Sequence, residues 1–83
     1  MTAEEFIFSH ASDGLELKVK NWTGTFIYNT KGPAYPEQST KDGRKRLSLN
    51  LRDRDKGLLV LVDEVIRIRT PQGRMWRGGL VLV

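Results

Sequence analysis

The sequence predicts a small all-β domain, an antiparallel barrel or sandwich of six to seven short strands. Apolar and polar residues alternate with a period of two along several segments, and no window of eleven residues or more keeps a helical period. Clusters rich in Gly, Pro and Asp separate these segments at intervals of roughly ten residues. The 83 residues fit one domain, 1–83.

Seven segments are expected to form strands. Leu15–Lys20 and Leu47–Arg52 alternate apolar and polar side chains, as half-buried antiparallel strands do. Leu58–Val62 is apolar at every position, which predicts a strand covered on both faces. In Val65–Arg69 we expect Ile66 and Ile68 to point inward and both arginines outward. The other expected strands are Phe6–Phe8, Thr25–Tyr28 and Leu80–Val83.

Turn chemistry connects these strands. Ser12–Gly14 and Asp42–Gly43 contain residues that tolerate positive φ. Asp53–Gly57 is a five-residue hairpin connection ending in Gly, and Thr70–Gly73 has Pro and Gly where a tight turn needs them. For a chain of this length, these strands are expected to form a small barrel of the OB-like or SH3-like type.

The segment 29–44 breaks this pattern, because it has no apolar periodicity and contains two prolines and two glycines. We expect a long loop here. Loops of this length in compact domains are usually functional or disordered, and we expect 29–43 to be more mobile than the flanking strands. Limited proteolysis is expected to cut first after Lys31 or Lys41.

Positive charge is concentrated in the second half of the chain. The net charge is +4, but residues 1–40 carry a net −2 and residues 41–83 a net +6, including all eight arginines. Guanidinium groups suit phosphate, so this half indicates either a polyanionic partner or a solvated strand face.

Catalysis and metal binding have little support. Ser9, His10, Ser12 and Asp13 lie in one turn, whereas the members of a catalytic triad normally come from separate elements. The chain has no cysteine and one histidine, which removes thiolate chemistry and most transition-metal sites. We therefore expect a protein that is not an enzyme and that has no metal or cofactor.

Basic and aromatic residues together favour binding of single-stranded nucleic acid. Such binding needs cations along the phosphate backbone and flat rings on which bases stack. Arg67 and Arg69 share one strand face, and the turn after them is expected to bring Arg74 and Arg77 to the same surface. The candidate residues are Arg44, Lys45, Arg46, Arg67, Arg69, Arg74, Arg77, Trp22, Tyr28, Tyr35 and Trp76.

The alternative is a protein-binding or assembly module, either a virus-encoded inhibitor or a structural subunit. Leu80–Val83 is apolar on both faces, and the wall of one barrel buries only one of them. We therefore expect a homo-oligomer in which this strand lies in or near the contact. The longest apolar run, Leu58–Val62, is five residues, too short to span a membrane. Met1–Glu5 is acidic where a secretion signal is basic, which predicts a cytoplasmic location (the host cytoplasm for a viral protein).

Overall fold

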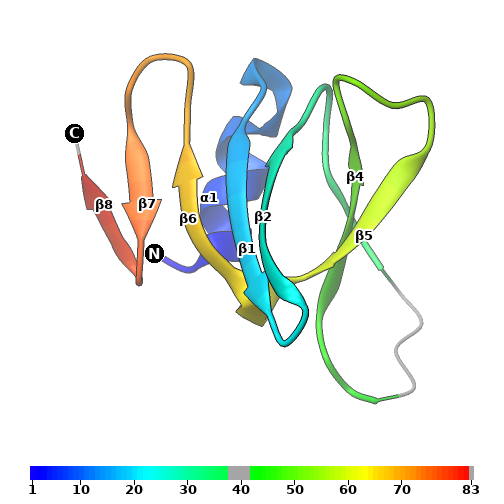
Figure 1. Ribbon diagram of the computed structural model, residues 1–83. Helices are drawn as coiled ribbons and strands as arrows, with labels where there is room; N and C mark the ends of the chain where they lie inside the picture. Colours follow the sequence, from blue (N-terminus) through cyan, green and yellow to red (C-terminus); the bar gives the residue numbers. More distant parts are fainter. Residues whose placement is uncertain (38–41, 83) are drawn as a thin grey trace.

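Two antiparallel sheets form most of the protein. The computed structural model describes residues 1–37 and 42–82. A five-stranded sheet has the order β2-β1-β6-β7-β8, and a three-stranded sheet has the order β3-β4-β5 (Figure 1). The elements are α1 (Ala3–His10), η1 (Ala11–Asp13), β1 (Glu16–Asn21), β2 (Gly24–Asn29), β3 (Tyr35–Pro36), β4 (Arg46–Asn50), β5 (Gly57–Leu61), η2 (Val62–Glu64), β6 (Val65–Arg69), β7 (Met75–Arg77) and β8 (Leu80–Leu82).

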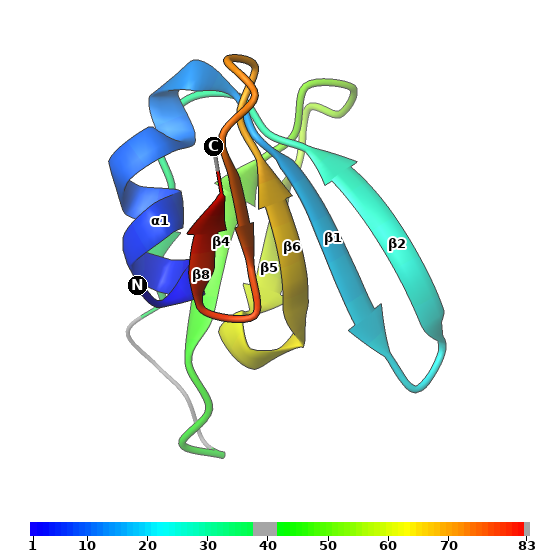
Figure 2. The same ribbon diagram turned by 90° about the vertical axis from the view of Figure 1, so that its left-hand side faces the viewer.

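The all-β prediction is confirmed in outline, but a closed barrel is wrong. Outside the named strands, one isolated bridge between Thr30 and Leu51 connects the chain that leaves β2 to the chain that leaves β4. The described strands do not close into a cylinder, and α1 lies beside them instead (Figure 2). Helix and sheets enclose one core. Its fully buried side chains include Phe6, Leu17, Leu47 and Ile68.

The expected strand at Phe6–Phe8 is the helix α1. Thr2 and Glu5 form a capping box: the Thr2 hydroxyl accepts a hydrogen bond from the Glu5 N–H at 3.1 Å, and Glu5 Oε1 accepts one from the Thr2 N–H at 3.0 Å. Hydrogen bonds to the Glu5 carboxyl, first from the Thr2 backbone N–H and then from the Thr2 side chain, lower the pKa of Glu5. Phe6 and Ile7 are buried and Phe8 is exposed, because helical geometry turns each residue by about 100°.

Two further strand predictions need correction. A β-bulge interrupts the pairing of β1 with β6, since Lys18 faces Arg67 while Val19 faces Val65. The extra residue, Ile66, is therefore exposed, and Val65 faces inward together with Ile68. The short strand β7, which the sequence pattern did not indicate, pairs with β6 and β8.

Described residues of the expected loop 29–44 bond to neighbouring strands. Thr30 is buried, and its hydroxyl accepts a hydrogen bond from the Leu15 N–H at 2.9 Å. The Lys31 N–H donates to the Asn50 carbonyl at 2.9 Å, and Tyr35–Pro36 pairs with β4 as β3. The expected cleavage site at Lys41 lies outside the described residues. Across the described ranges, no helix is long and apolar enough to cross a membrane.

Candidate nucleic-acid interface

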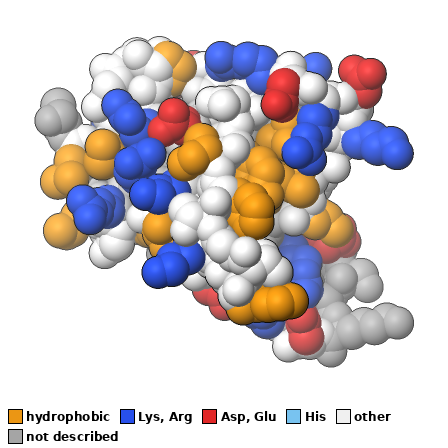
Figure 3. Space-filling view, viewed as in Figure 1, with side chains coloured by type: hydrophobic (Ala, Val, Ile, Leu, Met, Phe, Trp, Pro, Cys, Tyr) orange, Lys and Arg blue, Asp and Glu red, His pale blue; other side chains and the backbone are white. Residues whose placement is uncertain are grey.

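The outward surface of the five-stranded sheet carries a group of cations. Leu17, Ile68 and Trp76 point into the core, so the positions that alternate with them point outward. The outward cations of these strands are Lys18, Lys20, Arg67, Arg69 and Arg77, and we call four of them, Lys18, Arg67, Arg69 and Arg77, the outer basic face. Figure 3 shows Lys and Arg side chains gathered over the part of this sheet on the left of the view.

Three of these cations lie in one row across the sheet. Lys18 on β1 is directly opposite Arg67 on β6, and Arg67 is directly opposite Arg77 on β7. Neighbouring strands are about 4.8 Å apart, so each pair places like charges side by side. Directly opposed like charges destabilise a sheet. The row is therefore not explained by the stability of the fold.

Glu16 offsets part of this charge. Its Oε1 lies 3.1 Å from Arg67 Nη2 and 3.8 Å from Arg69 Nη1. Glu16 is the one acidic residue in the five strands β1, β2, β6, β7 and β8. Four cations against this carboxylate leave three positive charges on the face. A hollow lined by Lys18, Ile66, Arg67 and Arg77 lies within it.

Arg74 does not join the outer basic face as expected. The Thr70 N–H donates to the Arg74 carbonyl at 2.9 Å, so these two residues face each other at the end of the β6–β7 hairpin. Thr70 is buried on the core side of the sheet. Strand alternation therefore places Arg74 on the side opposite to Arg77, although its side chain is exposed.

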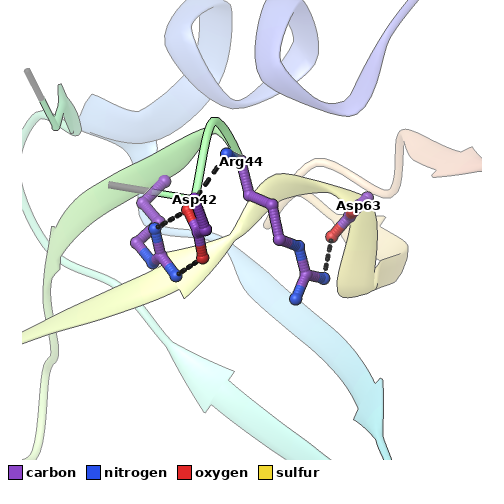
Figure 4. A network of polar contacts seen from close by, with 4 residues as sticks. Asp42, Arg44 and Asp63 are labelled. Atoms are coloured by element: carbon purple, nitrogen blue, oxygen red, sulfur yellow. Dashed lines mark hydrogen bonds and ion pairs between the residues drawn. The ribbon is translucent and has the colours of Figure 1, made fainter. Parts of the chain in front are cut away.

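The basic run 44–46 is paired with acids at the start of β4. Arg44 lies 3.0 Å from Asp63, and Lys45 lies 3.5 Å from Glu4. Arg46 contacts both carboxylate oxygens of Asp42, at 2.9 and 2.7 Å (Figure 4). The Arg46 guanidinium, with the Arg44 backbone N–H, holds the pKa of Asp42 well below its usual range. This run leads into β4 of the three-stranded sheet, and nearby carboxylates neutralise its charge.

The four predicted stacking rings lie in different environments. Trp76 is only 7% exposed, and its Nε1–H donates to the Met1 carbonyl at 2.7 Å, so it belongs to the core. Tyr28 is half-buried and stacks on Phe26 with 6.3 Å between ring centroids. Tyr35 is exposed, but on β3 in the other sheet.

Trp22 is the predicted ring that solvent reaches most freely. It is 95% exposed at the two-residue turn between β1 and β2. Asn21 Oδ1 accepts a hydrogen bond from the Thr23 N–H at 2.9 Å, which fixes the turn. Trp22 follows β1, the strand that contributes Lys18, so a ligand that lies along β1 can reach both side chains.

Sequence reasoning missed Lys18 as a member of the face. Its alternation with Leu17 and Val19 was visible, but its position opposite Arg67 depends on the pairing of β1 with β6. Within the described ranges, no group of three or more His, Cys, Asp and Glu side chains is placed to hold a metal ion. No family model matches the chain, and neither a curated protein nor a solved structure is significantly similar to it.

Proposed function

We propose that the protein binds single-stranded nucleic acid across the outer basic face. The observation that carries this proposal is the row of Lys18, Arg67 and Arg77 on three adjacent strands, with Arg69 beside it. Phosphate contacts supply most of the affinity in sequence-independent binding. Phosphates of a nucleic-acid strand that lie against this row relieve the repulsion between the like charges of the row.

Trp22 favours a single strand over a duplex. A fully exposed indole offers both faces for stacking, and only unpaired bases have free faces to stack on it. Trp76 has no place in this proposal because it is buried, and the run 44–46 has none because it is paired with acids.

The salt dependence of binding tests this proposal. Four phosphate contacts at about 0.7 each give a slope of about −3 for log affinity against log salt. We expect this slope when a short labelled oligo-dT is titrated at several salt concentrations, with partial quenching of the tryptophan emission. The Arg54→Ala variant, which loses an exposed guanidinium on the β4–β5 connection, is the control and should keep the slope. Absence of binding at low salt would overturn the proposal.

Assembly through β8 is the second candidate function. This strand is an edge of the five-stranded sheet, and its outward residues are apolar: Leu80 is 68% and Leu82 is 47% exposed. Among the described residues, 78–82 contain no charge and no proline to protect the edge. A second copy of the chain, paired antiparallel through β8, would satisfy the free backbone groups and place the outward leucines of the two copies side by side.

A double substitution on β8 tests this assembly. We expect the native protein to sediment as a dimer at tens of micromolar, and Leu80→Lys/Leu82→Lys to be a monomer. The outward residues are the ones to change, because Val81 packs against the core and Val83 lies outside the described residues. Leu59→Lys, at an exposed position on β5, should remain dimeric. A monomeric native protein would contradict the assembly and leave the nucleic-acid proposal intact.

A further inference from the structure

A second basic site lies at the end of the five-stranded sheet, beyond the row that defines the outer basic face. A hollow there is lined by Gly14, Glu16, Arg52, Arg69, Thr70 and Pro71, among others. It forms where β1 begins, where β6 ends and where the chain leaves β4. Arg69 borders both this hollow and the outer basic face, whereas Arg52 comes from the other sheet's connection and was not among the residues that the sequence singled out.

Gly14 makes room for the Arg52 guanidinium. A Cβ at position 14 would lie 2.8 Å from Arg52 Nη2 and 3.3 Å from the Thr30 carbonyl oxygen. Gly14 also has a φ of +81°, in the region that favours glycine. The guanidinium therefore lies against bare backbone. The backbone N–H of Arg52 donates to the Asn29 carbonyl at 2.8 Å, which fixes the backbone from which this side chain projects.

The hollow has more positive than negative charge. Arg52 forms no ion pair with any residue in 1–37 or 42–82. Arg69 contacts Glu16 at 3.8 Å, but Arg67 holds the same carboxylate oxygen more closely, at 3.1 Å. The guanidinium groups of Arg52 and Arg69 thus border the hollow. Glu16, its one carboxylate, also contacts Arg67. Paired guanidinium groups are the preferred ligands of a phosphate group.

We propose that this hollow binds the terminal phosphate of a nucleic-acid strand that lies on the outer basic face. A terminal phosphate monoester carries about −1.5 to −2 charges near neutral pH, more than an internal diester, and so matches two guanidinium groups better. The position at the start of β1 and the end of β6 suits the end of a nucleic-acid strand. This inference rests on the proposed function and extends it to a preference for phosphorylated ends.

Three oligo-dT probes of equal length test the preference: one without a terminal phosphate, one with a 5′-phosphate and one with a 3′-phosphate. We expect the native protein to bind one of the phosphorylated probes about tenfold more tightly than the unphosphorylated one. Arg52→Ala should remove this difference and bind the unphosphorylated probe within about twofold of the native affinity. Arg54→Ala, the matched control from the same connection, should keep the difference. Circular dichroism verifies that both variants fold.

The outcomes separate this inference from the proposed function. If the unphosphorylated probe binds with the expected salt slope but neither terminal phosphate tightens binding, the hollow is not a terminal-phosphate site and the proposed function stands. If Arg52→Ala keeps the preference, the site is elsewhere and the inference is overturned. If no probe binds, the proposed function and this inference both fail. In that case inorganic phosphate is titrated and the Gly14 amide resonance is followed by NMR. A shift in the native protein that is absent in Arg52→Ala would reassign the hollow to free phosphate.

Discussion

The double variant Arg67→Glu/Arg77→Glu is expected to bind single-stranded nucleic acid at least about a hundredfold more weakly than the native protein. Each charge-assisted contact contributes roughly 1.5 kcal/mol or more, and a loss of about 2.7 kcal/mol is a factor of a hundred. Two such contacts are removed, and two carboxylates then repel the phosphates. Because Arg67 is opposite both Lys18 and Arg77, the substitutions also break the row on which the proposed function depends.

A charge-matched variant distinguishes a local effect from a change in net charge. Arg54→Glu/Lys56→Glu changes the net charge by the same amount, at exposed positions between β4 and β5. We expect it to lose only about threefold in affinity, since distant surface charges are screened at physiological salt. Fluorescence anisotropy with unphosphorylated oligo-dT measures both variants. Equal losses would show that overall charge, and not the outer basic face, determines binding.

Replacing Phe6 is expected to cause the largest loss of stability. Phe6 is 0% exposed on the buried side of α1, and Phe→Ala substitutions at such sites cost about 3–5 kcal/mol. A domain of this size has a total stability of roughly 4–12 kcal/mol, so the variant loses much of it. Urea unfolding followed by circular dichroism gives the free energy of unfolding.

Phe8→Ala is the matched control for this experiment. Phe8 is exposed on the opposite side of the helix, so its truncation should change the free energy of unfolding by less than about 1 kcal/mol. In a strand, positions 6 and 8 share one face and their substitutions would have similar effects. Similar losses at the two positions would therefore contradict the helix.

Alternation, or a short run of apolar residues, was sufficient to locate the longer strands. The segments 47–52, 58–62 and 65–69 correspond to β4, β5 and β6 within two residues at each end. The expected cover on both faces of 58–62 is wrong, because Leu59 on β5 is 54% exposed. The helix α1 was not predicted, because its eight residues are fewer than the eleven over which a helical period was required. Thr2 and Glu5, with the capping-box spacing, were the local signal that could have revealed it.

The site required tertiary information. Alternation correctly placed Arg67 and Arg69 on one face, but the alignment of Arg77 and Lys18 with Arg67 depends on register and on the bulge at Ile66. The indole N–H of the buried Trp76 donates to the carbonyl of Met1, 75 residues away in the sequence. Lys45 likewise pairs with Glu4, which lies near the start of the chain. Such pairings between distant segments leave no local pattern in a single sequence.

Titration of the isotope-labelled protein with unphosphorylated oligo-dT, followed by NMR, tests the central claim most directly. The outer basic face requires the largest shifts at the backbone amides of β1, β6 and β7, together with the Trp22 indole N–H. The Trp76 indole N–H, which is bonded to the Met1 carbonyl, should change little. Shifts confined to the start of β4 and to η2, or no shifts at low salt, would contradict nucleic-acid binding by this face.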